Sequence, residues 1–447
     1  MHKNSFHLVP CFTFIFCSLL SCSENDKNEK STTAVEEKKI TYNIAAPTPL
    51  DQKEQQRIFD AVKLFYDTTL APSGFNGGFL VAKGGNIIFE KYRGTVNLDS
   101  AQVITANTPL HIASVSKTFT AMAILKLQEL GKLSVDDSLT KFFPQFNYPG
   151  VTIKTLLNHR SGLPNYLHFL KEVGWPDSVL MRNQDILDLI VNKKNILLKN
   201  VAKADTKFAY CNTNYALLAL IIEKVSGKPY PQFMQQNIFD PIGMKNTFVH
   251  FAGDSKTVSK SFDWKGRLML NNNLDGIYGD KNIYSTVQDL LKWDRILADT
   301  VFLSKKSLQM AYTPYSNEKP GIKNYGFGWR MNMYEDGKKI IFHNGWWHGN
   351  NAAFIRLVKD DVTIIAMSNK FARAVYGSKI LVNIFGNYFD EKATEEDDNV
   401  IPTNIPTVFT APTNKSKKVD GELRQQQNYN FEDMNKHIPV TENKLEK

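Results

Sequence analysis

Cysteine is scarce in this sequence, and its placement excludes a disulfide framework. The 447 residues contain four cysteines, at positions 11, 17, 22 and 211. Three of them lie within the first 22 residues, so a domain further along the chain holds Cys211 and, at most, Cys22. Small domains that depend on disulfides carry several cysteines spread through the fold. The stability of this protein therefore has to come from packing.

Charge of one sign is not concentrated in a way that would indicate a nucleic-acid partner. The formal net charge is +9, but Lys and Arg are intermixed along the chain with Asp and Glu. Nucleic-acid-binding domains show a basic stripe or a recognisable motif, and the sequence shows neither. We interpret the excess charge as a solvated basic surface and expect no nucleic-acid partner.

A long hydrophobic run is also missing. The most apolar stretch, residues 6–20, follows Lys3, is interrupted by Pro10 and is too short to span a bilayer comfortably. It ends in Leu-Leu-Ser-Cys22, which resembles a bacterial lipoprotein signal. In that family the signal is cleaved before the cysteine, so Cys22 would become the lipidated N-terminus. An ordinary secretory signal with an incidental cysteine is the alternative. The resemblance implies an anchored protein of the cell envelope, on a membrane surface facing the periplasm or the cell exterior.

Composition divides the chain into four parts. Residues 1–22 are the predicted lipoprotein signal, and residues 23–53, rich in Ser, Asn, Lys, Glu and Thr, are predicted to form a flexible linker. Residues 54–390 carry the periodic apolar patterns of a folded domain. Residues 391–447 combine an acidic run with prolines and polar residues, which predicts a disordered tail.

The apolar patterns within the domain predict an α+β fold. Five strand-like runs fall into two groups, at 78–82, 86–92, 339–343, 352–358 and 362–367. The first two surround a Lys-Gly-Gly hairpin signal, and the last three have the short connections of antiparallel pairing. Residues 132–320 are helix-rich, and 372–389 read as a closing helix. We predict an antiparallel sheet flanked by helices and built from the N- and C-terminal parts, with an inserted all-helical subdomain.

The segment 111–120 places a serine and a lysine at the start of a long apolar helix. Ser114 and Lys117 are three residues apart, so they share one helical face. Partial positive charge collects at a helix N-terminus, which suits a nucleophile that passes through an anionic intermediate. The same spacing occurs at residues 138/141 and 316/319, but neither pair precedes a long apolar helix. Context rather than spacing therefore indicates Ser114.

Two later segments supply groups that a serine nucleophile needs. A lysine acts as the base only when its amine is neutral, and a second polar group would complete the proton relay. Tyr210 and Asn212 precede an apolar helix at 214–227, although a packed core tyrosine is the alternative for Tyr210 alone. In the segment 342–349, Gly345 follows a strand and allows a ligand to approach the backbone. The next amide could join that of Ser114 in an oxyanion hole.

Taken in order, these segments resemble the serine β-lactamase and penicillin-binding protein superfamily, in the branch of class C β-lactamases and related esterases and D-amino-acid peptidases. The resemblance covers about residues 54–390 and rests on five segments, at 114–117, 156–164, 206–215, 283–286 and 343–345. It implies that Ser114 is the nucleophile and that Lys117 and Tyr210 share the role of general base. It also implies that Asn212 helps to position the substrate.

The strand segment matches the superfamily with two departures. By the resemblance, His343 and Gly345 stand on the strand that lines the pocket. β-Lactamases of this branch usually carry lysine where His343 stands, and a neutral histidine favours ester, amide or peptide substrates over β-lactams. Trp346 and Trp347 replace small residues after the glycine, so we expect Trp346 to contact the substrate and to narrow the pocket. A Pro-Gly usual before the tyrosine motif is replaced by Ala-Asp at 204–205.

The sequence thus predicts a serine hydrolase that acts through an acyl-enzyme, without metal or cofactor, on a small-molecule or peptide substrate. Esters, amides and D-amino-acid peptides are the candidate substrates, with β-lactams as a further one. The alternative is a non-catalytic lipoprotein that keeps the fold and binds peptidoglycan or another ligand. We interpret His111 and His159 as structural, and His348 as either a substrate contact or a loop residue. The oligomeric state stays open.

Overall fold

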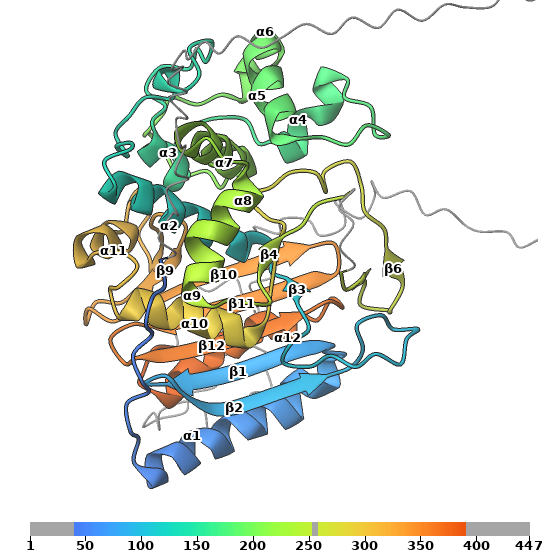
Figure 1. The fold of residues 1–447 in the computed structure, drawn as a ribbon, viewed down its shortest axis with the longest axis vertical. Coiled ribbons are helices and arrows are strands. Elements are labelled where there is room, and N and C mark those ends of the chain that lie inside the picture. The colour runs from blue at the N-terminus through green and yellow to red at the C-terminus, as the bar shows by residue number, and fades with distance from the viewer. Residues whose placement is uncertain (1–39, 253–257, 390–447) are drawn as a thin grey trace, which may run out of the picture. The chain divides into compact units, whose positions relative to one another are not determined.

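The computed structural model describes residues 40–252 and 258–389, in which a seven-stranded antiparallel sheet forms the central layer (Figure 1). The predicted signal with Cys22, most of the predicted linker and the predicted tail lie outside the described residues. Within the described ranges, no helix has both the length and the apolar character needed to cross a bilayer.

The sheet joins the two ends of the domain. Its strands follow the spatial order β2-β1-β12-β11-β10-β9-β8. Their bounds are Gly77–Lys83 (β1), Asn86–Arg93 (β2), Lys323–Tyr325 (β8), Arg330–Met333 (β9), Lys339–Trp347 (β10), Asn350–Leu357 (β11) and Val362–Ser368 (β12). The N-terminal strand β1 pairs antiparallel with β12, from Gly77 opposite Ser368 to Lys83 opposite Val362. The predicted α+β fold, with one sheet built from both parts of the chain, is confirmed.

One face of the sheet is covered by the N-terminal helix α1 (Gln52–Phe65) and by the last described segments of the chain (Figure 1). Those segments are a short helix α12 (Ala374–Gly377) and a 3₁₀ segment, Ser378–Ile384. The single closing helix predicted for 372–389 is therefore wrong. Gly377 weakens a continuous α-helix by about 1 kcal/mol relative to alanine, and β-branched residues follow it, so short segments pack separately onto the sheet.

The opposite face carries the helical part of the domain. The three long helices there are α2 (Ser116–Glu129), α7 (Asn212–Ser226) and α10 (Val287–Ala298). Helix α10 contacts β1 and β12, and α2 packs against α7, which is apolar nearly all round and buried from Thr213 to Ile222. Such a helix needs neighbours on every side, and α3 (Ile153–Leu157), α5 (Asn183–Asn192) and α8 (Tyr230–Met234) supply them.

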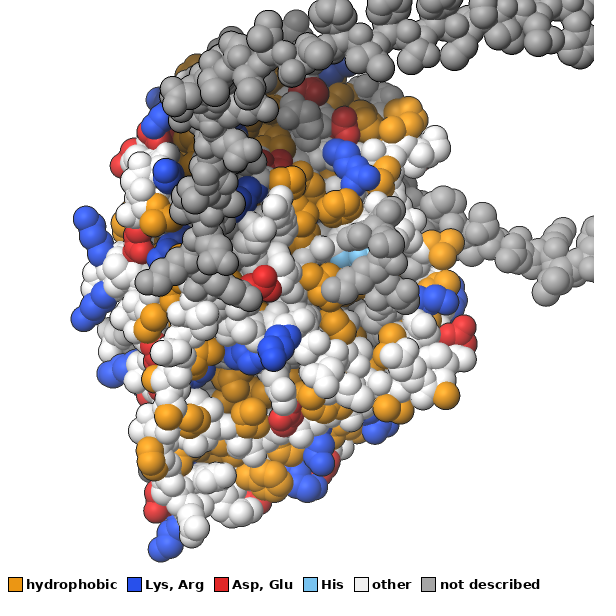
Figure 2. All heavy atoms as spheres, viewed as in Figure 1, with side chains coloured by type: hydrophobic (Ala, Val, Ile, Leu, Met, Phe, Trp, Pro, Cys, Tyr) orange, Lys and Arg blue, Asp and Glu red, His pale blue; other side chains and the backbone are white. Residues whose placement is uncertain are grey.

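The remaining elements of the insertion are short. Its other helices are α4 (Tyr166–Val173), α6 (Lys194–Leu197), α9 (Asp240–Ile242) and α11 (Lys305–Ala311). The insertion also contributes strands, so it is not all-helical as predicted: β7 (Ile283–Ser285) pairs with both β3 (Leu110–His111) and β4 (Phe248–Val249), and β5 (Ser261–Phe262) pairs with β6 (Leu268–Met269). On the face drawn in Figure 2, basic and acidic side chains are interspersed with hydrophobic ones.

Candidate active site

Ser114 lies in a 3₁₀ turn, Ala113–Val115, between β3 and the start of α2 at Ser116. The Val115 amide donates to the Ile112 carbonyl at 3.1 Å, which closes the turn. Ala113 has a φ of +47°, a left-handed conformation that residues other than glycine rarely adopt. The turn leaves Ser114 partly exposed while the residues on both sides of it are buried.

His111 stabilises this turn through a hydrogen bond to its backbone. Its Nδ1 accepts a hydrogen bond from the Ala113 amide at 3.1 Å, so the ring proton is on Nε2, which lies 3.1 Å from Asn282 Oδ1. Burial lowers the pKa of His111 to about 4, so the ring is neutral near pH 7 and both nitrogens are satisfied. His111 is thus a hydrogen-bonded part of the nucleophile turn.

Lys117 is fully buried and reaches back to the nucleophile. Its Nζ lies 3.0 Å from Ser114 Oγ and donates to the main-chain carbonyl of Asp280 at 2.8 Å. The first distance is within the reach required of a general base. A general base at this position accepts the serine proton while it donates a hydrogen bond to the carbonyl.

Aromatic rings surround the lysine amine. The Lys117 Nζ lies 5.1 Å from the ring centroid of Tyr210 and 5.7 Å from that of Tyr215. Tyr210 is partly exposed in the loop before α7, and Asn212, also partly exposed, is the first residue of that helix. The structure therefore brings Ser114, Lys117 and Tyr210 together at the head of α2, and Asn212 begins α7 two residues after Tyr210.

Gly345 on β10 sits directly against the nucleophile turn. A Cβ at this position would lie 2.2 Å from the Ile112 carbonyl oxygen and 3.2 Å from Ala113 Cβ. Since the first neighbour is backbone, it cannot swing away, and only glycine allows the strand to approach so closely.

The hydrogen-bonding direction of β10 can be followed from its hairpin with β9. The Tyr334 amide donates to the Lys338 carbonyl, so even-numbered residues of β10 direct their peptide groups toward β9. The last pair between the two strands is Phe342 with Arg330. Trp346 is also even-numbered and lies beyond Phe342 on β10. Its amide therefore points toward the β9 side of the strand, at a place where β9 has already ended. An amide that faces this edge, beside the nucleophile turn, has the orientation that an oxyanion donor requires.

His343 is buried and is held in one tautomer. Its Nδ1 donates to the Asn344 carbonyl at 2.7 Å, so Nε2 is the acceptor for the Tyr325 hydroxyl at 3.2 Å. Burial, with the nearby cations Arg330 and Lys117, holds the pKa of His343 well below its usual range. The residue that stands in place of the usual lysine is therefore neutral.

The two tryptophans of β10 point to opposite faces, as successive strand residues do. Trp346 is 37% exposed and meets the Phe371 ring edge-on at 6.2 Å. Trp347 shares the face of Gly345, and its Nε1 donates to Asp275 Oδ1 at 2.7 Å. Trp347 therefore lies on the nucleophile side of β10, and the substrate contact expected of Trp346 stays a prediction.

Sequence reasoning missed three residues next to this site. Asp280 supplies the carbonyl for Lys117, and Lys281 beside it is 3% exposed. The local sequence carries no signal for either residue, because a charged pair in a loop before β7 ordinarily indicates a solvated surface. Arg330 was also missed; its guanidinium carbon lies 4.9 Å from the Tyr210 ring centroid. Arg330 is partly exposed and forms no ion pair with the acidic residues that the structure describes.

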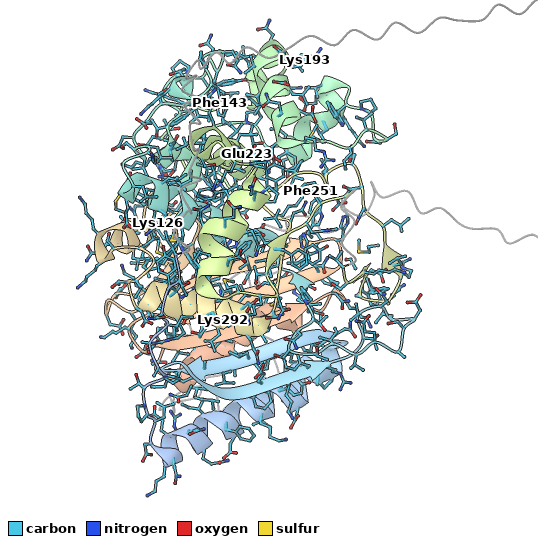
Figure 3. The ribbon with its side chains drawn as sticks, in the orientation of Figure 1. Lys126, Phe143, Lys193, Glu223, Phe251 and Lys292 are labelled. Carbon is cyan, nitrogen blue, oxygen red and sulfur yellow. The ribbon has the colours of Figure 1, made fainter. Side chains whose placement is uncertain are left out.

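Away from the site around Ser114, the described residues form a surface hollow but no metal-binding cluster. Over residues 40–252 and 258–389, no group of three His, Cys, Asp or Glu side chains is arranged to hold a metal ion. A surface hollow of about 360 Å³ lies in the helical part, where Figure 3 labels Phe143 and Glu223 of its lining. None of the residues gathered around Ser114 lines it.

A serine and a buried lysine at the head of one helix, a tyrosine at the head of a second, and a glycine strand against the turn are the features of one known family. The family described as Beta-lactamase matches residues 68–385. The chain belongs to the beta-lactamase family. The superfamily predicted from the sequence is confirmed, and members of this family are serine hydrolases.

Similar proteins agree with the family. Penicillin-binding protein 4* of Bacillus subtilis strain 168 is 33% identical over 366 residues, which cover 77% of this chain and 80% of that protein. The putative penicillin-binding protein PbpX of the same organism is 30% identical over 330 residues, 71% of this chain and 78% of that protein. A crystal structure of a penicillin-binding protein from Bacillus halodurans has a TM-score of 0.63 at 25% identity, covering 71% of this chain and 98% of that one. Class C membership stays a prediction.

Proposed function

We propose that this beta-lactamase family member is a serine hydrolase whose acyl-enzyme forms on Ser114. The observation that carries the proposal is the placement of the Lys117 amine. It is fully buried, lies 3.0 Å from Ser114 Oγ and is anchored on a backbone carbonyl at 2.8 Å. Among the described residues, no acidic side chain is a direct hydrogen-bond partner of Lys117, and this arrangement supports proton transfer from the serine.

The reaction then proceeds in two steps. Lys117 takes the proton from Ser114 Oγ as this oxygen attacks the substrate carbonyl carbon, and the amides of Ser114 and Trp346 stabilise the oxyanion. The leaving group departs with a proton returned by Lys117 or Tyr210. A water molecule then attacks the Ser114 ester and passes a proton to the base, which returns it to Ser114 Oγ as the C–O bond breaks and the acid is released.

The charges around the site favour a substrate with an anionic group. His343 is neutral, as its lowered pKa indicates. Arg330, over the Tyr210 ring at 4.9 Å, is instead a fixed cation beside the site. A planar guanidinium binds a carboxylate through two parallel hydrogen bonds. Among esters, amides and D-amino-acid peptides, we therefore favour peptide or amide substrates that carry a free carboxylate, in line with relatives named penicillin-binding proteins.

We also propose that the protein is anchored at the cell envelope through Cys22. The support is the Leu-Leu-Ser-Cys22 pattern after an apolar run, followed by a polar segment long enough to serve as a tether. Mass spectrometry of the N-terminal peptide from membranes tests this: a diacylglyceryl-modified Cys22 is expected, and an unmodified N-terminus elsewhere contradicts it.

A fluorophosphonate probe tests the catalytic proposal directly. The purified full-length protein should form one covalent adduct, located on Ser114 by mass spectrometry, and Ser114→Ala should form none. A folded protein without an adduct, as judged by circular dichroism, would instead favour the non-catalytic ligand-binding alternative. Hydrolysis rates are then compared for nitrocefin, p-nitrophenyl esters and a D-alanyl-D-alanine peptide, the last both as the free acid and as its C-terminal amide. We expect the free acid to be preferred, and Arg330→Met to abolish that preference.

A further inference from the structure

A buried network of charged and polar side chains lies behind Lys117. Asp280 is 2% exposed, Lys281 is 3% exposed and Tyr166 is fully buried. The Tyr166 hydroxyl donates to Asp280 Oδ2 at 2.5 Å and accepts from Lys281 Nζ at 2.7 Å. Lys281 Nζ also lies 3.6 Å from Asp280 Oδ1. The three side chains therefore form a closed triangle of contacts.

Asp280 connects this triangle to the nucleophile. Its main-chain carbonyl accepts the hydrogen bond from Lys117 Nζ, while its side chain is held by Tyr166 and Lys281. The preceding carbonyl, that of Gly279, accepts from Thr120 Oγ1 of α2 at 2.6 Å. Lys117 thus contacts the main-chain carbonyl of Asp280, and Lys281 contacts its side chain. The side-chain contacts fix the direction of the Asp280 carbonyl.

Lys281 also contacts the opposite wall of the site. Its ammonium lies 4.7 Å from the ring of Trp347 and 5.1 Å from that of Tyr166, positions in which aromatic faces attract a cation. Trp347 in turn donates to Asp275, which also accepts from His348 Nε2 at 3.0 Å. The network therefore ties the segment that anchors Lys117 to the strand that carries Gly345.

Stability does not explain why these groups are retained. Removing charges from water is costly, and a buried ion pair replaced by well-packed apolar residues often leaves a protein equally or more stable. Burial indeed lowers the pKa of Lys281, although Asp280 and Asp275 counter it. A group that is expensive to bury and adjoins the nucleophile is better explained by the site it supports.

We infer that Lys281 is a positioning residue for the reaction: with Tyr166 it fixes Asp280, and through the Asp280 carbonyl it holds the Lys117 amine at Ser114. The inference rests on the proposed function. Lys281 itself does not touch the reacting atoms. Its loss should slow acylation without weakening substrate binding, because a displacement of about 1 Å in a catalytic group can cost on the order of 100-fold.

The test compares rates of fluorophosphonate labelling of Ser114 in the full-length protein. Lys281→Met keeps the length of the side chain but removes its charge and its N–H donors. We expect labelling to slow about 10- to 100-fold, with kcat for a p-nitrophenyl ester reduced and KM nearly unchanged. Lys281→Arg should recover part of the rate.

Two further variants keep the test decisive. Asp280→Asn combined with Lys281→Met removes both charges, so a folding failure caused by an unpaired aspartate is avoided. The matched control is Asp294→Asn with Arg356→Met, a buried ion pair between α10 and β11 whose side chains are 5% and 2% exposed. We expect the control to label at the wild-type rate when folded. Wild-type rates in the Asp280/Lys281 double variant would overturn the inference alone, whereas an unlabelled wild-type protein would overturn the proposed function and the inference with it.

Discussion

The two faces of the central sheet are built from different kinds of side chain. On the α1 side, Phe65, Tyr66, Phe79 and Phe89 form one group of rings with centroids 5.4 to 6.2 Å apart. On the α2 side, buried ionisable and polar groups gather around Ser114. Strand β10 shows the contrast within two residues, since Phe342 packs into the α1-side core and the next residue, His343, belongs to the site. The α1-side core stabilises the fold, whereas the α2 side buries the polar groups of the site.

The difference has an energetic reason. Burial of apolar surface stabilises the fold by about 25 cal/mol per Å², whereas buried polar groups require partners to avoid a penalty. A site that buries Lys117, Asp280 and Lys281 together contributes little to stability. The α1-side core is mostly apolar, with Lys379 buried at 4.1 Å from the Phe342 ring centroid, and packs chiefly for stability. Substitutions on the two faces should therefore affect rate and stability separately.

Lys117→Met is expected to show the largest difference between the effect on the labelling rate and the effect on stability. Removal of the base should slow fluorophosphonate labelling of Ser114 by roughly 10³- to 10⁴-fold, while the melting temperature changes little because methionine fills the same space without a buried amine. Lys126→Met is the matched control, since Lys126 lies on the same helix and its Nζ donates to the Phe302 carbonyl at 2.8 Å (Figure 3). Labelling of Lys117→Met at the control rate would mean that another group is the base.

Phe79→Ala should show the reverse pattern. The ring is fully buried between α1 and the sheet, and its truncation leaves a cavity that should cost about 3–5 kcal/mol of unfolding free energy. Urea denaturation measures the loss, and labelling of the protein that remains folded should proceed at the wild-type rate. A slowed rate in fully folded protein would show that the two faces are coupled through the sheet.

Local sequence patterns predict several elements of the fold and the nucleophile. The hairpin β1–β2 and the helix α7 follow from alternation and from an apolar run, which are properties of neighbouring residues. Ser114 was recognised in the same way, by the apolar helix that follows it. The exact extent of β10 was not, because its continuation from His343 to Trp347 depends on pairing with β11. Without that pairing the sequence could not show which tryptophan faces the nucleophile.

The partners of Lys117 were beyond the reach of local patterns. Its hydrogen bond to the Asp280 carbonyl joins residues 163 positions apart, and the contact of Arg330 with Tyr210 also joins distant segments. A charged pair in a loop ordinarily indicates a solvated surface. Only the packing of that loop under α2 makes Asp280 and Lys281 part of the site.

The smallest expected effect is a loss of folding stability at acid pH, and it is expected from buried histidines on the α2 side of the sheet. His111 has a pKa of about 4 in the folded protein, below the value of about 6.5 expected for an unfolded chain. The unfolded state therefore binds the proton first, so stability is complete above about pH 6.5 and is lost as the pH falls toward 4. The full shift corresponds to about 3 kcal/mol. The pKa values of His159 and His343 are also lowered, mainly by burial, and act in the same direction.

His111→Asn isolates the share of this one residue. Asparagine keeps an oxygen that can accept from the Ala113 amide, as Nδ1 does at 3.1 Å, but it does not titrate. Unfolding free energies measured between pH 7.5 and 4.5 should fall less steeply for His111→Asn than for the wild type. His168→Asn is the control, because His168 is exposed on α4 and should leave the slope unchanged. Equal slopes for all three proteins would mean that protonation of His111 does not oppose folding, and that acid acts on the site through His159 and His343 instead.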